Sequence, residues 1–315
     1  MRITNNTLIN NMLRQLNSGL GRLGQYQEQL ASGRRVLKPS DDPAGIVSIS
    51  QLKTSLFENQ QLLSNVDSAY SWLDSADTVL ASVTSVMHRA KELTIYAATE
   101  VLSDSDRYAI QEEMKQLFDN VLQLANSTHS GRYLFGGQKT TTVPFTRESL
   151  DPNDPNFFNI VYQGGRSDDG TASQSLEINA NSVLDLSLVQ TKVNADGKVE
   201  DSLFMPILST FRKIIADMEQ GNVSDLSSVD IEQLESALDN VLSYRAVVGA
   251  KVNRVQMAKE RLQELKINFN QLLSNAQDID VAETIMQLKS EEYVYRTALA
   301  VGARIIQPSL VDFLK

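Results

Sequence analysis

The chain has no cysteine among its 315 residues, and its only histidines are His88 and His129. Without cysteine there can be no disulfide bond and no thiolate metal site. Two imidazoles are too few for a multi-histidine metal site within one chain. Aromatic residues make up 6% of the sequence, and no apolar run approaches the roughly 18–20 residues of a membrane span. We therefore expect no cofactor, no metal and no membrane-spanning helix.

Positive charge is scarce overall, since the formal net charge is −10 at pH 7. That balance argues against general nucleic-acid binding. Residues 1–40 differ from the rest, because they contain six arginines and lysines and a single acid, Glu28. This basic segment could contact an acidic partner, a membrane surface or nucleic acid, but we favour the solvated side of a helix.

Glycine and proline are absent from residues 46–130, which have the apolar spacing of long helices. The first helix is predicted from about residue 46 to 99, roughly 80 Å at 1.5 Å per residue. It follows Ser40-Asp41-Asp42-Pro43, which supplies capping side chains and a proline for the first turn. A second helix is predicted after Ser103, because Ser103 and Asp106 resemble a capping box.

Residues 131–200 have a different composition, with seven of the 15 glycines of the chain and three of its seven prolines. Short strands are predicted at Arg132–Phe135, Thr140–Phe145, Phe157–Gln163 and Ser175–Asn179. Helical spacing returns at about residue 201 and continues to the C-terminus. The predicted fold is therefore mainly α. Long helices from both chain ends form a bundle or coiled-coil rod, with a small β-rich insert at its tip.

Apolar residues near both ends of the chain follow a heptad rhythm. At the N-terminal end the seam is Ile9, Leu13, Leu16, Leu20, Leu23, Gln27 and Leu30, and towards the C-terminus it is Leu262, Leu265, Phe269, Leu272, Ala276 and Ile279. Such a seam places apolar side chains along one side of a helix, which another helix must cover. The two ends are thus expected to pair with each other or with copies of themselves, as in an architectural protein.

Three glycines, Gly19, Gly21 and Gly24, fall inside the first of these helices but at none of the expected seam positions. Each costs about 1 kcal/mol relative to alanine, so we expect the helix to become ordered only on assembly. Residues 19–24 also match the letters G-x-G-x-x-G. A dinucleotide site needs a preceding strand, whereas helical spacing runs through this segment. We find no G-x-S-x-G elbow and predict no catalytic residue.

Several segments resemble the bacterial flagellin superfamily, and within it the proteins of the hook–filament junction. The resemblance begins with Gln29-Leu30-Ala31-Ser32-Gly33-Arg34-Arg35 and Ser40-Asp41-Asp42-Pro43-Ala44-Gly45, and it includes His88–Leu93, Ser105–Glu113 and Asp278–Thr284. Gly131–Gly137 and the ending Ala298–Leu314 are more similar to junction proteins than to filament flagellins. The resemblance adds Leu299, Leu310 and Phe313 to the expected assembly seam.

The resemblance implies three domains. Residues 1–40 with 276–315 would form an inner, assembly-ordered coiled coil, 41–130 with 201–275 a helical rod, and 131–200 an outer β-rich insert. The implied partners are copies of the chain in a ring, the neighbouring hook-associated junction protein, flagellin and a cytosolic flagellar export chaperone. Because the opening residues contain no apolar signal region, we expect type III export without a cleaved signal peptide.

We therefore expect a non-catalytic structural adaptor that joins the hook-associated junction to the filament. A filament-forming flagellin is the nearest alternative. An enzyme whose site lies in residues 131–200 and a cytosolic coiled-coil scaffold are the alternatives of other classes.

Overall fold

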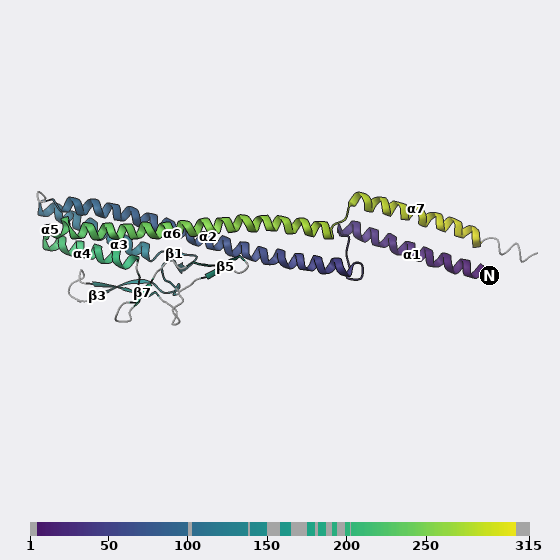
Figure 1. Ribbon diagram of the computed structural model, residues 1–315, viewed down its shortest axis with the longest axis horizontal. Coiled ribbons are helices and arrows are strands. Elements are labelled where there is room, and N and C mark those ends of the chain that lie inside the picture. Colours follow the sequence, from purple (N-terminus) through teal and green to yellow (C-terminus); the bar gives the residue numbers. More distant parts are fainter. Residues whose placement is uncertain are drawn as a thin grey trace, which may run out of the picture. The chain divides into compact units, whose positions relative to one another are not determined.

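A computed structural model describes residues 5–99, 103–137, 139–149, 158–164, 175–179, 182–186, 191–193, 199–201 and 203–306 (Figure 1). The helices are α1 (Asn5–Ser32), α2 (Pro43–Ala97), α3 (Asp104–Ala125), α4 (Phe204–Gln220), α5 (Val223–Ser227), α6 (Val229–Gln277) and α7 (Val281–Ile306). The strands are β1 (Thr128–His129), β2 (Arg132–Tyr133), β3 (Phe145–Ser149), β4 (Phe158–Tyr162), β5 (Ser175–Asn179), β6 (Ser182–Asp185), β7 (Thr191–Val193) and β8 (Val199–Asp201). A mainly α fold with a β-rich insert is confirmed.

The long helices begin where the sequence predicts. Before α2, Oδ1 of Asp42 accepts a hydrogen bond of 2.8 Å from the backbone N–H of Gly45. Before α3, the hydroxyl of Ser103 accepts from the backbone N–H of Asp106 and donates to its carboxylate at 2.6 Å. These side chains satisfy N–H groups that have no partner inside the helix, which fixes the residue at which each helix starts.

The chain divides into two compact units. The first comprises residues 1–60 and 264–315, and the second comprises residues 61–263. Helices α2 and α6 contribute to both units, whereas α1 and α7 belong to the first alone. The assignment of residues 1–40 and 276–315 to one assembly domain stays a prediction.

The core of the second unit is built by helices whose apolar residues recur every three, four or seven positions. On α2 the fully buried series includes Val66, Leu73, Leu80, Val83 and Met87, all at most 1% exposed. On α6 the buried series is Val241, Val248, Val255 and Leu262, spaced by seven. This spacing keeps one side of each helix turned towards its neighbours and so produces a long, narrow core.

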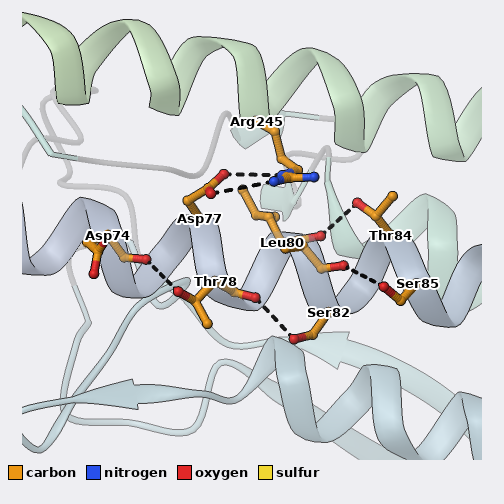
Figure 2. Close-up of polar contacts among 9 residues, drawn as sticks. Asp74, Asp77, Thr78, Leu80, Ser82, Thr84, Ser85 and Arg245 are labelled. Carbon is orange, nitrogen blue, oxygen red and sulfur yellow. Dashed lines mark hydrogen bonds and ion pairs between the residues drawn. The ribbon is translucent and has the colours of Figure 1, made fainter.

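Ion pairs show that α2 and α6 run antiparallel through the second unit. Asp67 pairs with Lys259 at 2.8 Å, and Asp77 pairs with Arg245 at 3.1 Å (Figure 2). Residue numbers rise along α2 as they fall along α6, as an antiparallel pair requires. These side chains are partly exposed, so the pairs set the register of the helices more than they stabilise them.

Small hydroxyl side chains occur on both the exposed and the buried sides of α2. Thr78 donates to the carbonyl of Asp74 at 3.0 Å, Ser82 to that of Thr78 at 3.1 Å, and Thr84 to that of Leu80 at 2.8 Å (Figure 2). Each hydroxyl is therefore satisfied by its own helix, four residues earlier. Their hydroxyl protons are thus used within the helix itself.

The insert consists of two-stranded antiparallel hairpins in the order β1–β2, β3–β4, β5–β6 and β7–β8. Strands β4 and β5 confirm two predictions. A strand was also expected at Thr140–Phe145, but β3 begins at Phe145, the residue where the expected strand ends. The short strands β6, β7 and β8 were not predicted. Phe145 stacks near Tyr162 and Phe204, with ring centroids 5.1 and 5.5 Å away, so the insert shares a core with α4.

The insert lies along the sides of the second-unit helices (Figure 1). The amide of Asn65 on α2 donates to the carbonyl of Glu177 in β5 at 3.1 Å. From α6, Arg254 donates to the hydroxyl of Ser182 in β6 at 2.9 Å. The expected position at the tip of the rod is therefore refined: the end of the second unit is formed by turns between helices, and the strands pack beside it.

Candidate assembly surface

Helices α1 and α7 of the first unit pack against each other along their length (Figure 1). Arg22 of α1 forms an ion pair of 2.8 Å with Glu291 of α7. A Cβ atom added to Gly19 would lie 3.7 Å from the ring of Tyr295. One added to Gly302 would overlap the side chain of Met12. Positions that come later on α1 therefore meet positions that come earlier on α7, so the two helices are antiparallel.

The covered face of α1 follows a heptad rhythm with small residues opposite large ones. Its half-buried or buried residues include Ile9, Met12, Leu16, Gly19, Leu23, Tyr26 and Leu30, and those of α7 include Thr284, Leu288, Glu291, Tyr295, Ala298 and Gly302. Gly19 faces Tyr295, and Gly302 faces Met12. This complementarity lets the two backbones approach closely without strained side chains.

The structure places the residues of the predicted N-terminal seam on two sides of α1. Leu16 and Leu23 lie on the face covered by α7, but Leu13 is 51% exposed and Leu20 is 55% exposed. No glycine occupies the predicted seam, but Gly19 lies on the face that α7 covers and is buried there. The predicted spacing uses Leu13 and Leu20, whereas the covered face uses Met12 and Gly19. A Cβ atom at position 19 would make an ordinary van der Waals contact with the ring of Tyr295, so a small residue fits this position.

The C-terminal seam has a different place from the one expected. In the described part of the chain, the helix that covers α1 is α7, not the segment 262–279. Leu262 is 2% exposed in the second unit, while Leu265, Phe269 and Ile279 are half-buried and Leu272 is 51% exposed. Of the tail residues added by the resemblance, Leu299 is 45% exposed. Leu310 and Phe313 lie outside the described residues.

Four large apolar side chains form an exposed surface on one side of the α1–α7 pair. Leu13 and Leu20 each follow a covered residue of α1 by one position, and Ile285 and Leu299 do the same on α7. In an antiparallel pair, these residues, each one position after a covered residue, lie on the same side of the two-helix pair. We call these four residues the α1–α7 flank. Ile285 is 44% exposed, so every member keeps close to half of its surface in solvent.

The connections that lead into α2 and out of α6 are hydrogen-bonded to each other. The backbone N–H of Arg35 donates to the carbonyl of Gln277 at 2.7 Å, and that of Ile279 donates to the carbonyl of Gly33 at 3.2 Å. The buried side chain of Gln29 donates to the carbonyl of Arg35 at 2.8 Å. The end of α1 and the start of α7 are thereby fixed together. No sequence pattern we used pointed to this joint.

The start of α7 is capped by the side chain of Asp280. Oδ1 of Asp280 accepts hydrogen bonds from the backbone N–H groups of Ala282 at 2.9 Å and Glu283 at 3.1 Å. Together with the joint, this cap fixes the residue at which α7 begins and therefore its register against α1.

The motifs considered for other chemistry occupy structural positions. Residues 19–24 lie in the middle of α1, so the glycines do not form a phosphate-binding turn. His129 packs its ring edge against Trp72 and lies 2.8 Å from the hydroxyl of Ser75, which donates to the carbonyl of Ser71. Among the described residues, no group of three or more histidine, cysteine or acidic side chains is placed to hold a metal ion. No described helix combines the length and apolarity needed to cross a membrane.

Comparison with known proteins decides the family. Residues 3–140 match the family described as bacterial flagellin N-terminal helical region, and residues 231–314 match the bacterial flagellin C-terminal helical region. The chain belongs to the bacterial flagellin family. The two matches cover α1, α2, α3, nearly all of α6, α7 and the joint, whereas α4 and α5 lie outside them.

Relatives over the full length include junction proteins and filament proteins. The chain is 27% identical to flagellar hook-associated protein 3 of Escherichia coli over 90% of each chain. It is 23% identical to the flagellin of Bacillus subtilis, over 98% of this chain and 97% of that one. Its fold resembles that of a putative flagellar hook-associated protein from Vibrio parahaemolyticus, with a TM-score of 0.61 and 19% identity over 76% of this chain and all of that chain. FlgL of Bacillus cereus gives a TM-score of 0.52 and 22% identity over 71% of this chain and 99% of that chain.

Proposed function

We propose that this flagellin-family chain is a structural adaptor of the bacterial flagellum that joins the hook-associated junction to the filament. The observation that carries this proposal is the similarity to flagellar hook-associated protein 3 over 90% of both chains. The relatives are structural proteins, and the motifs of this chain that suggested other chemistry are used in helix packing. The adaptor works without catalysis, through helix–helix contacts with its neighbours.

The contact surface is the α1–α7 flank, and its occupant is the α1–α7 pair of another copy of the chain. In a ring, the flank of each copy would contact a different side of the α1–α7 pair of the next copy, so that each subunit uses two surfaces. Full burial of a leucine or isoleucine stabilises by about 1.5–3 kcal/mol, and about half of that is still available here. The four side chains together offer roughly 3–6 kcal/mol per subunit before ordering costs.

The same surface suits neighbours of the same family on either side of the ring. The flagellin of Bacillus subtilis matches this chain over nearly its whole length, so a flagellin has counterparts of both terminal helices. The adaptor would therefore contact the neighbouring hook-associated junction protein on one side and flagellin on the other. Both contacts would continue the helical packing that joins its own copies.

We further propose that the chain leaves the cell through the flagellar export apparatus without a cleaved signal, after a cytosolic chaperone has bound its C-terminal region. Membership of the flagellin family supports this route. Mass spectrometry of the extracellular protein should detect a peptide that begins within the first two residues. A mature protein that lacks the opening residues would contradict export without cleavage.

The test of the adaptor function is electron microscopy of cells from which the gene has been deleted. We expect hooks without filaments and unassembled flagellin in the medium, because filament subunits would have no surface on which to start. Restoring the gene should restore filaments. Normal filaments on the deleted cells would refute the proposal.

A filament-forming flagellin is the second candidate, favoured by the match to Bacillus subtilis flagellin over 98% of this chain. Purified subunits separate the two functions. An adaptor should stop at short rings or remain monomeric, whereas a flagellin should polymerise alone into long filaments.

A further inference from the structure

Two buried aspartates meet one lysine where α4, α5 and α6 converge, at one end of the second unit (Figure 1). Asp230 lies in the first turn of α6 and its side chain is 0% exposed. Nζ of Lys213 on α4 lies 2.9 Å from its Oδ1. Asp217, one turn further along α4, is 8% exposed and accepts a hydrogen bond of 3.2 Å from the side chain of Asn222 at its Oδ1.

These carboxyl groups have fewer donors than two ionised carboxylates need. Apart from Lys213, no hydrogen-bond donor in the described part of the chain reaches either oxygen of Asp230, and none reaches Oδ2 of Asp217. One ammonium group faces two acids, so full ionisation would leave a net negative charge in a buried place. An unpaired buried carboxylate is costly, and such groups usually take up a proton instead.

We propose that Asp230 and Asp217 hold one proton between them in the folded protein, as a carboxylic acid–carboxylate pair that ties α6 to α4. The shared proton supplies the missing hydrogen bond, since the acid O–H of one group donates to the carboxylate of the other. It also balances the charge, because one remaining negative charge then faces one lysine. The pair differs from the ion pairs along α2 and α6, whose members are partly exposed.

The electrostatics of the neighbouring groups agree with this geometry. Burial raises the pKa of Asp230; the ion pair with Lys213 lowers it, and the carboxyl group of Asp217 raises it further. The hydrogen bond to Asp230 raises the pKa of Lys213, and Asp225 on α5 is a further acid close to that lysine. A carboxyl group with a higher pKa in the folded than in the unfolded chain stabilises the fold below its unfolded pKa. That stability is lost as the pH rises through the folded pKa.

The proton can be observed directly in the full-length protein labelled with ¹³C at aspartate side-chain carboxyls. At pH 6 exposed carboxyls are ionised. We expect one aspartyl signal with the shift of a protonated or proton-sharing acid, and its loss in Asp230→Asn. If every aspartyl signal of the wild-type protein is that of a carboxylate at pH 6, the proposal is wrong. This measurement needs no variant to fold.

Thermal unfolding gives an independent test. Asparagine has the shape of a protonated aspartate and can donate to Asp217, so Asp230→Asn should unfold at the wild-type temperature or higher at pH 6. The midpoint of the wild-type protein should fall as the pH rises above the ordinary aspartate pKa of about 4, and that of Asp230→Asn should fall less. Asp239→Asn, an exposed change on the same helix, should keep the wild-type slope. A midpoint of Asp230→Asn well below that of Asp239→Asn at pH 6 would show that Asp230 acts as an ionised partner of Lys213.

Discussion

Replacing Leu13 and Leu20 by aspartate should block assembly while the subunit remains folded. Both side chains are about half exposed on the α1–α7 flank, outside the face that α7 covers. Leu16, in contrast, lies on that covered face, so a charge there would break the α1–α7 pair itself. The double change Leu13→Asp and Leu20→Asp therefore separates docking between subunits from folding within one.

The magnitude follows from the exposed fractions. Burying the remaining half of each leucine would stabilise a contact by about 0.75–1.5 kcal/mol, so the pair contributes about 2 kcal/mol. Losing 2 kcal/mol weakens a contact roughly thirtyfold. Two aspartates at a contact between copies would add the cost of removing their charges from water, which is several kcal/mol for an unpaired ion. Because every copy carries the change, assembly should be lost.

The assay compares the purified subunit with cells that express it. The monomer should keep its thermal unfolding midpoint to within a few degrees, while electron microscopy should show hooks without filaments. The matched control, Asn11→Asp with Ser18→Asp, adds the same charges at exposed positions of α1 away from the flank and should give normal filaments. Filaments of normal length on cells carrying the Leu13 and Leu20 changes would refute the role of the flank.

Two further changes probe how the first unit is held together. Gly302→Leu should destabilise the first unit by about 1–3 kcal/mol, because the new side chain would overlap Met12. Adding Met12→Ala to Gly302→Leu should restore part of that loss. The control Gly21→Ala has open space around it and should stabilise the first unit by up to about 1 kcal/mol. Gln29→Ala should cost about 1–2 kcal/mol, since it leaves a buried carbonyl of the joint without its donor, whereas the exposed Gln27→Ala should change stability by less than about 0.5 kcal/mol. Thermal unfolding of the purified variants measures each effect.

The boundaries of the long helices were predictable because local side chains fix them. Asp42 and Ser103 cap α2 and α3 through hydrogen bonds that depend only on residues three positions away. The strands β4 and β5 were found for a similar reason, since several alternating residues define each of them. The short strands β7 and β8 have three residues each, too few for a periodic pattern to appear.

The phase of the α1 seam was not predictable from α1 alone. Which residues of α1 are covered depends on its packing against α7, whose Tyr295 lies more than 270 residues from Gly19 in the sequence. The joint between the connections was missed for the same reason, because backbone hydrogen bonds such as that from Arg35 to Gln277 leave no residue preference. In both cases the deciding contact is between distant parts of the chain, and sequence periodicity reports only on local structure.

The packing of α1 against α7 also changes the expectation that α1 is ordered by assembly alone. Its three glycines weaken the isolated helix by about 3 kcal/mol, but Gly19 packs beside the ring of Tyr295 on the face that α7 covers. The stability of α1 should therefore depend on α7 within the same chain. Hydrogen exchange on the monomer should show equal protection for residues 12–30 and 284–302, because the two helices open together. Protection of α7 with rapid exchange throughout α1 would show that α1 does wait for a neighbouring subunit.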